Sequence, residues 1–199
     1  MLRCSVRNET MTTADATRPR PTPERKRWTY ADYCRIPPDR KRHEIIDGRH
    51  YVTPAPSPYH QAVGLRLAYE LMRLVEKTGR GRVFISPIDV HLAPGTVVQP
   101  DLVVLRPRTR SIVGDTKLTG VPDLLIEVLS PSNRRYDCQV KRERYERAGV
   151  REFWIVDPEA RSIEQLVLRS GAYASRGVAT GAITLHTFRG ITIDLREVW

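Results

Sequence analysis

A nearly uninterrupted apolar run, residues 124–129, carries one glutamate, Glu127, in its interior. Such a run is typical of a strand in the middle of a sheet that is covered on both faces. An unpaired carboxylate buried there costs several kcal/mol, so Glu127 must become neutral, pair with a cation or bind a metal ion. The chain therefore needs a central sheet whose interior holds a specialised polar group.

A second apolar run, residues 102–105, has Asp101 at its head. One interpretation is structural: each acid forms a salt bridge with one of the 28 arginines, or lies at a strand end. The other is chemical, because carboxylates from adjacent strands supply the hard oxygen ligands that Mg²⁺ prefers. A bound Mg²⁺ can polarise a phosphodiester and lower the pKa of an attacking water.

Lys141 is one of only five lysines in the chain, and it lies on a helix predicted over 137–148. Tyr136, Val140 and Ala148 mark the inner face of this helix, and Lys141 lies beside that face with Tyr145 one turn further on. Lys141 is therefore expected either to reach the same site as the two acids or to be an exposed helix charge.

The remaining pattern predicts an α/β or α+β fold with a long helix on one face of a sheet. Asp47-Gly48 between two short strand-like runs predicts a hairpin. A Ser57-Pro58 cap predicts a helix that continues to Gly79. Its expected core-facing residues are Leu65, Ala68, Tyr69, Leu71, Met72 and Val75. A short helix is expected over 30–35, and strands over 82–92, 99–105, 123–129, 152–157, 162–169, 172–178 and 190–195.

Residues 1–27 are rich in Thr, Pro and Arg and lack an apolar signal region, so they are predicted to be a disordered tail. Met11 is an alternative start, and residues 28–199 are expected to form one domain. No apolar run approaches the ~18 residues of a membrane helix. The three cysteines are widely spaced and form no C-x-x-C pair, which favours a reducing cytoplasm.

The formal net charge of +10 has two parts. Residues 1–42 carry eleven basic and five acidic groups, a net charge of +6. In the remainder, a net charge of +4 lies between Arg134 and Arg151, around the helix that carries Lys141. This stretch is where a phosphate backbone would be held, although a solvated arginine-rich surface is the competing interpretation.

Six sequence blocks resemble, in order and with compatible spacing, the Uma-two family of proposed restriction endonucleases within the PD-(D/E)xK nuclease superfamily. The resemblance covers roughly residues 28–199. It rests on His43-Glu44-Ile45-Ile46-Asp47-Gly48, Pro58-Tyr59-His60-Gln61, Gln99-Pro100-Asp101-Leu102, residues 122–132, Asp137…Lys141…Tyr145…Gly149-Val150 and residues 152–158.

The resemblance implies a restriction-endonuclease-like mixed central β-sheet with flanking helices. It also implies that Asp101 and Glu127 are metal ligands and that Glu44 is a further acid at the site. Lys141 would stabilise negative charge on the phosphate. The superfamily's simplest pattern places this lysine two residues after the second acid, where this chain has Leu129. The resemblance implies that the lysine has moved to the following helix.

Four further residues are weaker substrate-binding candidates: His60, Ser130, Arg134 and Arg135. A histidine in the first turn of a helix is more often a structural contact, and Ser130 can simply end its strand. Asp137 can support Lys141 or favour the helix N-terminus, and Asp47 is assigned to the turn.

The expected function is a Mg²⁺-dependent endonuclease, with Mn²⁺ as a substitute. Its expected substrate is DNA, and the sequence leaves RNA open as the alternative. Cutting both strands of a duplex would favour a homodimer. The alternative is a non-catalytic nucleic-acid-binding or protein-binding module on the same fold, with the acids as ion-pair partners. A glycosidase with Asp101 and Glu127 as acid and base is not supported. The sequence shows no aromatic-rich signature of a sugar-binding cleft, and this function would leave Lys141 unexplained.

Overall fold

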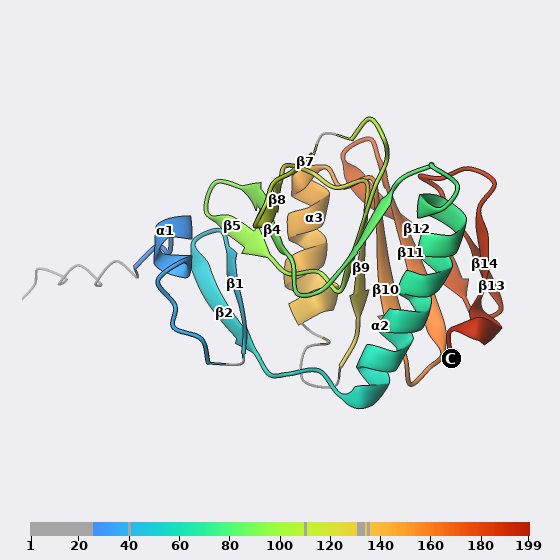
Figure 1. The fold of residues 1–199 in the computed structure, drawn as a ribbon, viewed down its shortest axis with the longest axis horizontal. Coiled ribbons are helices and arrows are strands. Elements are labelled where there is room, and N and C mark those ends of the chain that lie inside the picture. Colours follow the sequence, from blue (N-terminus) through green and yellow to red (C-terminus); the bar gives the residue numbers. More distant parts are fainter. Residues whose placement is uncertain (1–25, 40, 110, 131–133, 135) are drawn as a thin grey trace, which may run out of the picture.

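The computed structural model describes residues 26–39, 41–109, 111–130, 134 and 136–199. The predicted tail lies outside this range except for its last two residues, as do Met11 and Arg135. The described residues form two six-stranded sheets and a two-stranded sheet, accompanied by one long helix and shorter helical segments (Figure 1). No helix among them is long and apolar enough to cross a membrane.

The central sheet has the strand order β12-β11-β10-β9-β6-β3. Strands β9 and β10 are parallel, and the other neighbours are antiparallel. The strands are β3 (Arg82–Ile85), β6 (Leu102–Leu105), β9 (Leu124–Val128), β10 (Glu152–Asp157), β11 (Ser162–Arg169) and β12 (Ala172–Ala179). The apolar run that contains Glu127 is therefore an inner strand, as its composition predicts.

The second sheet has the order β2-β1-β5-β4-β8-β7. Its strands are β1 (Arg42–Ile46), β2 (Arg49–Thr53), β4 (Asp89–Ala93), β5 (Thr96–Val98), β7 (Ile112–Val113) and β8 (Lys117–Thr119). The predicted hairpin joins β1 to β2, and Asp47 and Gly48 adopt φ values of 51° and 75°. Positive φ at both turn residues is what a two-residue hairpin with the native strand twist requires.

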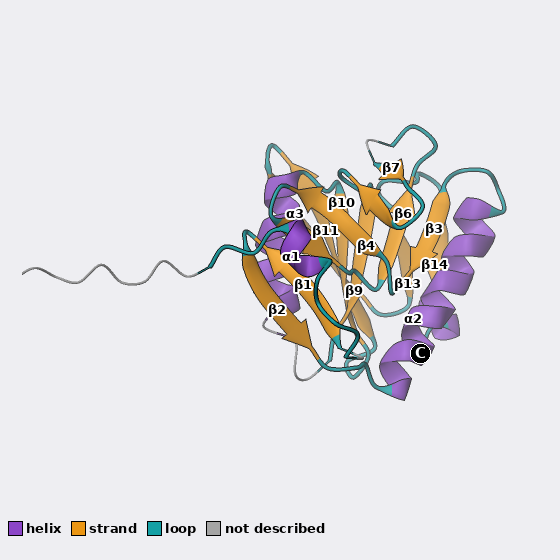
Figure 2. Ribbon diagram, turned by 60° about the vertical axis from the view of Figure 1, so that its left-hand side comes forward, coloured by secondary structure: helices purple, strands orange, loops and turns teal. Residues whose placement is uncertain are grey.

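The helices cover opposite faces of the central sheet (Figures 1 and 2). Helix α2 (Pro58–Leu71) begins at the Ser57 cap and continues as a π-helical turn, Met72–Glu76. It packs on Leu124, Ile126 and Val128, whereas the intervening residues of β9 face α3 (Arg142–Ala148) and the second sheet. The period of two therefore directs Glu127 into the space between the two sheets.

The predicted inner face of α2 is partly wrong. Leu65 and Tyr69 are 63 % and 61 % exposed, and Met72 is also exposed. The helix carries two apolar stripes with the same spacing, so periodicity alone did not distinguish them. The buried stripe consists of Val63, Leu67, Ala68, Leu71 and Val75.

The predicted strand over 82–92 divides into β3 and β4, which belong to different sheets. The division falls at Ser86-Pro87, where proline lacks the N–H that a ladder needs. Four strands of two or three residues, β5, β7, β8 and β13 (Ala182–Thr184), were not predicted. Strand β13 pairs with β14 (Thr192–Asp194), and the short segments α1 (Tyr30–Tyr33) and the 3₁₀ turn Leu195–Glu197 complete the fold.

The helix predicted over 137–148 is present, but its first part is a π-helix. Residues Tyr136–Lys141 form the π-helical segment, and α3 follows without a break. Gly149 ends α3 in the left-handed conformation, with φ 85°. Short π segments inside α-helices are frequent at functional sites.

Candidate functional site

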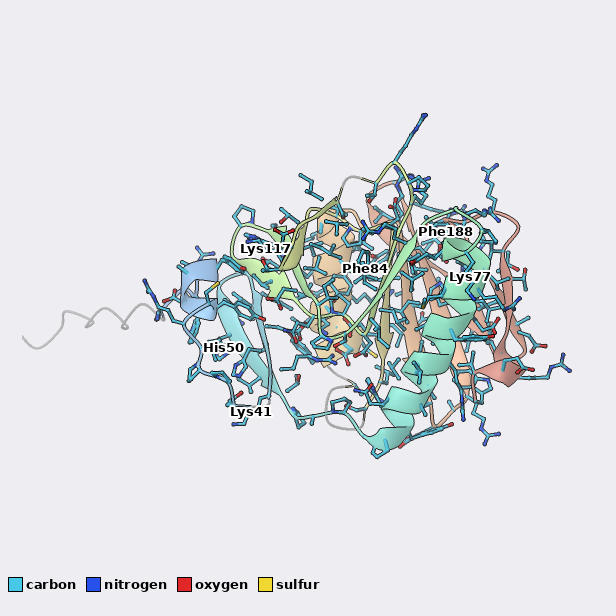
Figure 3. All side chains as sticks on the ribbon, in the orientation of Figure 1. Lys41, His50, Lys77, Phe84, Lys117 and Phe188 are labelled. Carbon is cyan, nitrogen blue, oxygen red and sulfur yellow. The ribbon has the colours of Figure 1, made fainter. Side chains whose placement is uncertain are left out.

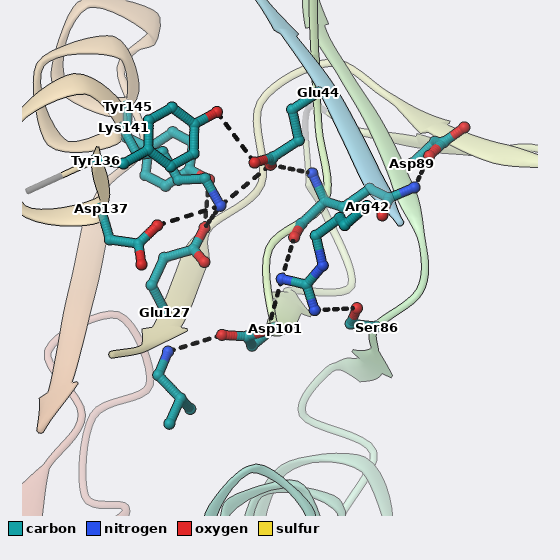
Figure 4. Close-up of polar contacts among 12 residues, drawn as sticks. Arg42, Glu44, Ser86, Asp89, Asp101, Glu127, Tyr136, Asp137, Lys141 and Tyr145 are labelled. Atoms are coloured by element: carbon teal, nitrogen blue, oxygen red, sulfur yellow. Dashed lines mark hydrogen bonds and ion pairs between the residues drawn. The ribbon is translucent and has the colours of Figure 1, made fainter. Parts of the chain in front are cut away.

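Four buried carboxylates meet around Lys141 where β1 of the second sheet faces β9 of the central sheet (Figure 4). Glu44 comes from β1, Glu127 from β9, and Asp101 directly precedes β6. Asp137 and Lys141 both come from the π-helical segment. The structure thus brings together all four residues predicted to be catalytic.

Lys141 is 2 % exposed, so it is not a solvated helix charge. Its Nζ lies 2.9 Å from Glu127 Oε1, 3.1 Å from Glu44 Oε1 and 3.5 Å from Asp137 Oδ1. Burial alone would lower the pKa of Lys141, but these carboxylates raise it above its usual value. The side chain is therefore a fixed positive charge at the centre of the cluster.

Glu127 Oε1 also accepts a hydrogen bond from the Tyr145 hydroxyl at 2.6 Å. Burial raises the pKa of Glu127 well above its usual value, Lys141 opposes that rise, and the neighbouring acids reinforce it. The site therefore disfavours the charged form of Glu127, and carboxyl groups with strongly shifted pKa values are frequent at functional sites.

Glu44 contacts the segment between β5 and β6 and the π-helical segment through its two carboxylate oxygens. Oε1 accepts the backbone N–H of Gln99 at 2.7 Å, and Oε2 accepts the Tyr136 hydroxyl at 3.0 Å. These contacts fix the carboxylate beside Lys141 and hold the segment that leads to Asp101 against β1.

Asp101 has partners from three other parts of the chain. Arg42 Nη1 donates to Oδ1 at 2.9 Å, and Oδ2 lies 3.2 Å from His60 Nε2 and accepts the Val128 N–H at 2.8 Å. Burial would raise the pKa of Asp101, but the His60 hydrogen bond and the charge of Arg42 lower it to about 2. His60 is itself buried, and its Nδ1 has no hydrogen-bond partner among the described residues.

Asp137 lies four residues before Lys141 and shares its surroundings. Burial raises the pKa of Asp137 to about 6, with Glu44 and Asp101 adding to the shift and Lys141 opposing it. The prediction that Asp137 supports Lys141 agrees with their separation of 3.5 Å.

The charges of this cluster do not balance. Glu44, Asp101, Glu127 and Asp137 face the two cations Lys141 and Arg42, which leaves two units of negative charge when all four acids are ionised. A divalent cation would neutralise this excess, and the donors are the hard oxygens that Mg²⁺ prefers.

No group of three or more potential ligands at metal-binding spacing is present in the described part of the chain. This does not conflict with Mg²⁺, which binds through one or two carboxylates and keeps several waters. The donor set therefore fits a Mg²⁺ site completed by water and phosphate oxygens.

Among the weaker substrate-binding candidates, His60 contacts this cluster through Asp101. Arg134 pairs with Asp157 at 2.7 Å, and Arg135 lies outside the described residues. Ser130 follows β9 and makes contacts of its own.

The basic stretch around α3 is partly engaged with the hairpin turn. Arg147 and Arg144 lie 2.9 and 3.5 Å from the carboxylate of Asp47. Asp47 therefore does more than form its turn, because it neutralises part of the positive charge that was predicted to hold a phosphate backbone.

Arg42 and the two tyrosine hydroxyls were not predicted at the site. Arg42 also donates to Ser86 Oγ at 3.0 Å and to the Gln99 carbonyl at 3.3 Å. One signal was available, because Arg42 precedes Glu44 by two residues in a strand and must share its face. Tyr145 was placed one turn beyond Lys141, but nothing in the sequence identified its hydroxyl as a donor to Glu127.

A family model, Uma2, described as "Putative restriction endonuclease", matches residues 30–196. The chain belongs to the Uma2 family. This confirms the resemblance drawn from the six sequence blocks. A search of curated proteins gave no match to this Uma2 chain.

Among solved structures, the Uma2 chain is similar to a "putative nuclease belonging to DUF820" from Anabaena variabilis. The TM-score is 0.68 at 16 % identity, over 85 % of this chain and 96 % of that chain. At this identity the likeness shows the fold alone. It confirms the predicted mixed α/β architecture of a nuclease-like fold.

Proposed function

We propose that the protein is a metal-dependent endonuclease that hydrolyses phosphodiester bonds in DNA, with Mg²⁺ as its cofactor and Mn²⁺ as a substitute. The observation that carries this proposal is the buried cluster of four acids with Lys141 and Arg42, which has an excess of two negative charges when all four acids are ionised. We assign the catalytic domain to residues 28–199.

Asp101 and Glu127 would hold the metal ion. Strands β6 and β9 are antiparallel with Leu102 opposite Ile126, so the next pair along this register is Asp101 and Glu127. Opposed side chains in such a pair have Cβ atoms about 4.5–5.5 Å apart, which suits two ligands of one ion. When bound, the ion would polarise the phosphodiester and lower the pKa of the attacking water.

Lys141 supplies a fixed positive charge for the negative charge that develops on the phosphate. Glu44 and Asp137 hold its ammonium group in place, at 3.1 and 3.5 Å. His60 orients Asp101 through its Nε2, which lies 3.2 Å from Asp101 Oδ2.

Incubation of the purified full chain with supercoiled plasmid or single-stranded DNA and Mg²⁺ or Mn²⁺ tests the assignment. We expect cleavage that Glu127→Gln and Lys141→Ala each reduce by about 100-fold or more, as for loss of a group that stabilises transition-state charge. Glu143→Gln and Lys77→Ala are matched controls, because both residues are exposed, and they should retain cleavage. Absence of cleavage with every metal, or cleavage that survives both site variants, would refute the proposal.

A second candidate is a non-catalytic nucleic-acid-binding module. It is favoured by the internal pairing of the acids, since Asp101 contacts Arg42 and Glu127 contacts Lys141 without any added ion. In that case metal should cause no thermal shift, salt should weaken DNA binding steeply, and Glu127→Gln should leave binding intact.

A homodimer is part of the nuclease proposal, because two copies of the site would cut both strands of a duplex. Light scattering on the protein bound to a short duplex measures this directly. A mass of one chain per duplex, together with cleavage of both strands, would contradict it.

A further inference from the structure

A basic hollow lies at the other end of β9 from the acidic cluster. Its volume is about 470 Å³, and its lining residues are Arg106, Arg151, Leu168, His186, Thr187 and Arg189. Asp123, at the base of this region, precedes Glu127 by four residues, which is about 13 Å along an extended strand. The hollow is therefore separate from the proposed catalytic site.

Asp123 contacts two of the arginines. Its buried carboxylate accepts the backbone N–H and the Nε of Arg106, both at 3.0 Å, and the Nε of Arg151 lies 4.0 Å away. The Arg106 guanidinium is therefore oriented by a hydrogen bond, and the Arg151 Nε lies at the limit of ion-pair distance from the same acid. Neither terminal NH₂ group of Arg106 or Arg151 has a hydrogen bond or ion pair with another described residue, and this edge of a guanidinium can bind phosphate in a fork.

Glu152 fixes the loop that carries the third arginine. It is 0 % exposed and accepts the backbone N–H groups of His186 and Thr187, at 3.1 and 2.7 Å. The Trp154 indole and the Gln165 amide also donate to it. Burying a carboxylate costs free energy unless it is hydrogen-bonded. Glu152 meets this cost with hydrogen bonds that anchor residues 186–187.

The same loop is anchored by apolar packing. Phe188, labelled in Figure 3, is buried in the core beneath the loop. Arg80 donates to the carbonyl oxygen of Arg189, which holds the next residue as well. The backbone that presents Arg189 is therefore rigid, although the guanidinium itself has no ion pair with any described residue.

Positive charge exceeds negative charge in this hollow. Three arginines line it, against Asp123 at its base and Glu152 behind the loop. A volume of about 470 Å³ lies within the ~300–1,000 Å³ range of small-molecule sites. Oriented guanidinium groups of different segments around one hollow are the chemistry that recognises phosphate.

We propose that this hollow binds a small phosphorylated ligand of nucleotide size, with Arg106, Arg151 and Arg189 as the phosphate-binding residues. The site does not depend on the proposed nuclease activity, because none of its residues contacts the acidic cluster.

Isothermal titration of the full chain with pyrophosphate and with ADP, in the absence of metal, tests the site. We expect binding that weakens with added salt and that the double variant Arg151→Gln/Arg189→Gln reduces at least 10-fold, as for loss of charge-assisted hydrogen bonds. Arg161→Gln/Arg176→Gln removes the same charge from exposed positions elsewhere, and it should change affinity less than twofold. Glu127→Gln should bind as the wild type does, whether or not DNA cleavage is observed.

Three results would overturn the inference. One is no binding of either anion at millimolar concentration. Another is an equal loss in both double variants, which would indicate a general effect of net charge. The third is binding of duplex DNA but of neither small anion, with the loss confined to Arg151→Gln/Arg189→Gln, which would assign the hollow to a nucleic-acid backbone.

Discussion

Replacing Lys141 with methionine removes the central positive charge of the acidic cluster and keeps a side chain of similar length. The four carboxylates then face Arg42 alone, so the unneutralised charge grows from two units to three. Removing one partner of a buried ion pair costs about 3–5 kcal/mol. A domain of this size loses about 2–4 °C in Tm per kcal/mol, so Lys141→Met should lower Tm by about 6–20 °C.

Glu127→Gln should change the stability of the metal-free protein in the opposite direction, toward a higher free energy of unfolding. It removes one excess negative charge, while Lys141 keeps Glu44 and Asp137 as partners. The raised pKa of Glu127 gives the pH dependence: the wild type loses stability as pH rises through that raised value, and glutamine does not. The variant should therefore be at least as stable as the wild type at alkaline pH, with the advantage vanishing in acid.

Urea denaturation followed by tryptophan fluorescence, to which the buried Trp154 contributes, measures both effects with a chelator present. The double variant Lys141→Met/Glu127→Gln should be more stable than Lys141→Met, because it restores the original excess of two charges. Lys77→Met is the exposed control and should stay within about 0.5 kcal/mol. The charge reasoning is wrong if Lys141→Met changes the free energy of unfolding by no more than about 0.5 kcal/mol. It is also wrong if adding Glu127→Gln to Lys141→Met lowers the stability further.

Three further outcomes follow from the same cluster. Tyr145→Phe leaves Glu127 without its 2.6 Å donor and should cost about 1–3 kcal/mol in urea denaturation, more than Tyr59→Phe at the surface; equal costs would contradict this. The pKa of Asp137 is raised to about 6, so the wild type should lose stability relative to Asp137→Asn as the pH rises from about 4 to 6. Parallel pH profiles of the unfolding free energy of the two proteins would disprove this. Mg²⁺ at about 100 times its Kd should stabilise the wild type by about 2.7 kcal/mol and Glu127→Gln by less, and identical thermal shifts would exclude Glu127 as a ligand.

The elements that depend on neighbouring residues could be predicted from the sequence. The hairpin at Asp47-Gly48 and the helix that begins at Ser57-Pro58 are both present, because turn and cap chemistry is local. The acids were also found, because a carboxylate within an apolar strand departs from what core packing allows.

Partners that lie far apart in the sequence could not be predicted in the same way. Arg42 and Asp101 are 59 residues apart, and Glu44 and Tyr136 are 92 apart, so their contacts depend on how the two sheets meet. The second sheet is built largely from strands of two to five residues, too short to give a clear alternating pattern. The exposed stripe of α2 was misjudged because its spacing equals that of the buried stripe.

The contact between Asp101 and the Val128 N–H affects how catalysis should be dissected. Strand β6 begins at Leu102, so this carboxylate supplies the terminal hydrogen bond between β6 and β9. Asp101→Ala would remove a proposed metal ligand and also the hydrogen bond that holds the end of the sheet next to Glu127. Asp101→Asn keeps an oxygen acceptor for the Val128 N–H. If this variant is inactive while the Val128 amide stays protected from hydrogen exchange, the loss of activity is due to the lost ligand and not to local unfolding of the sheet.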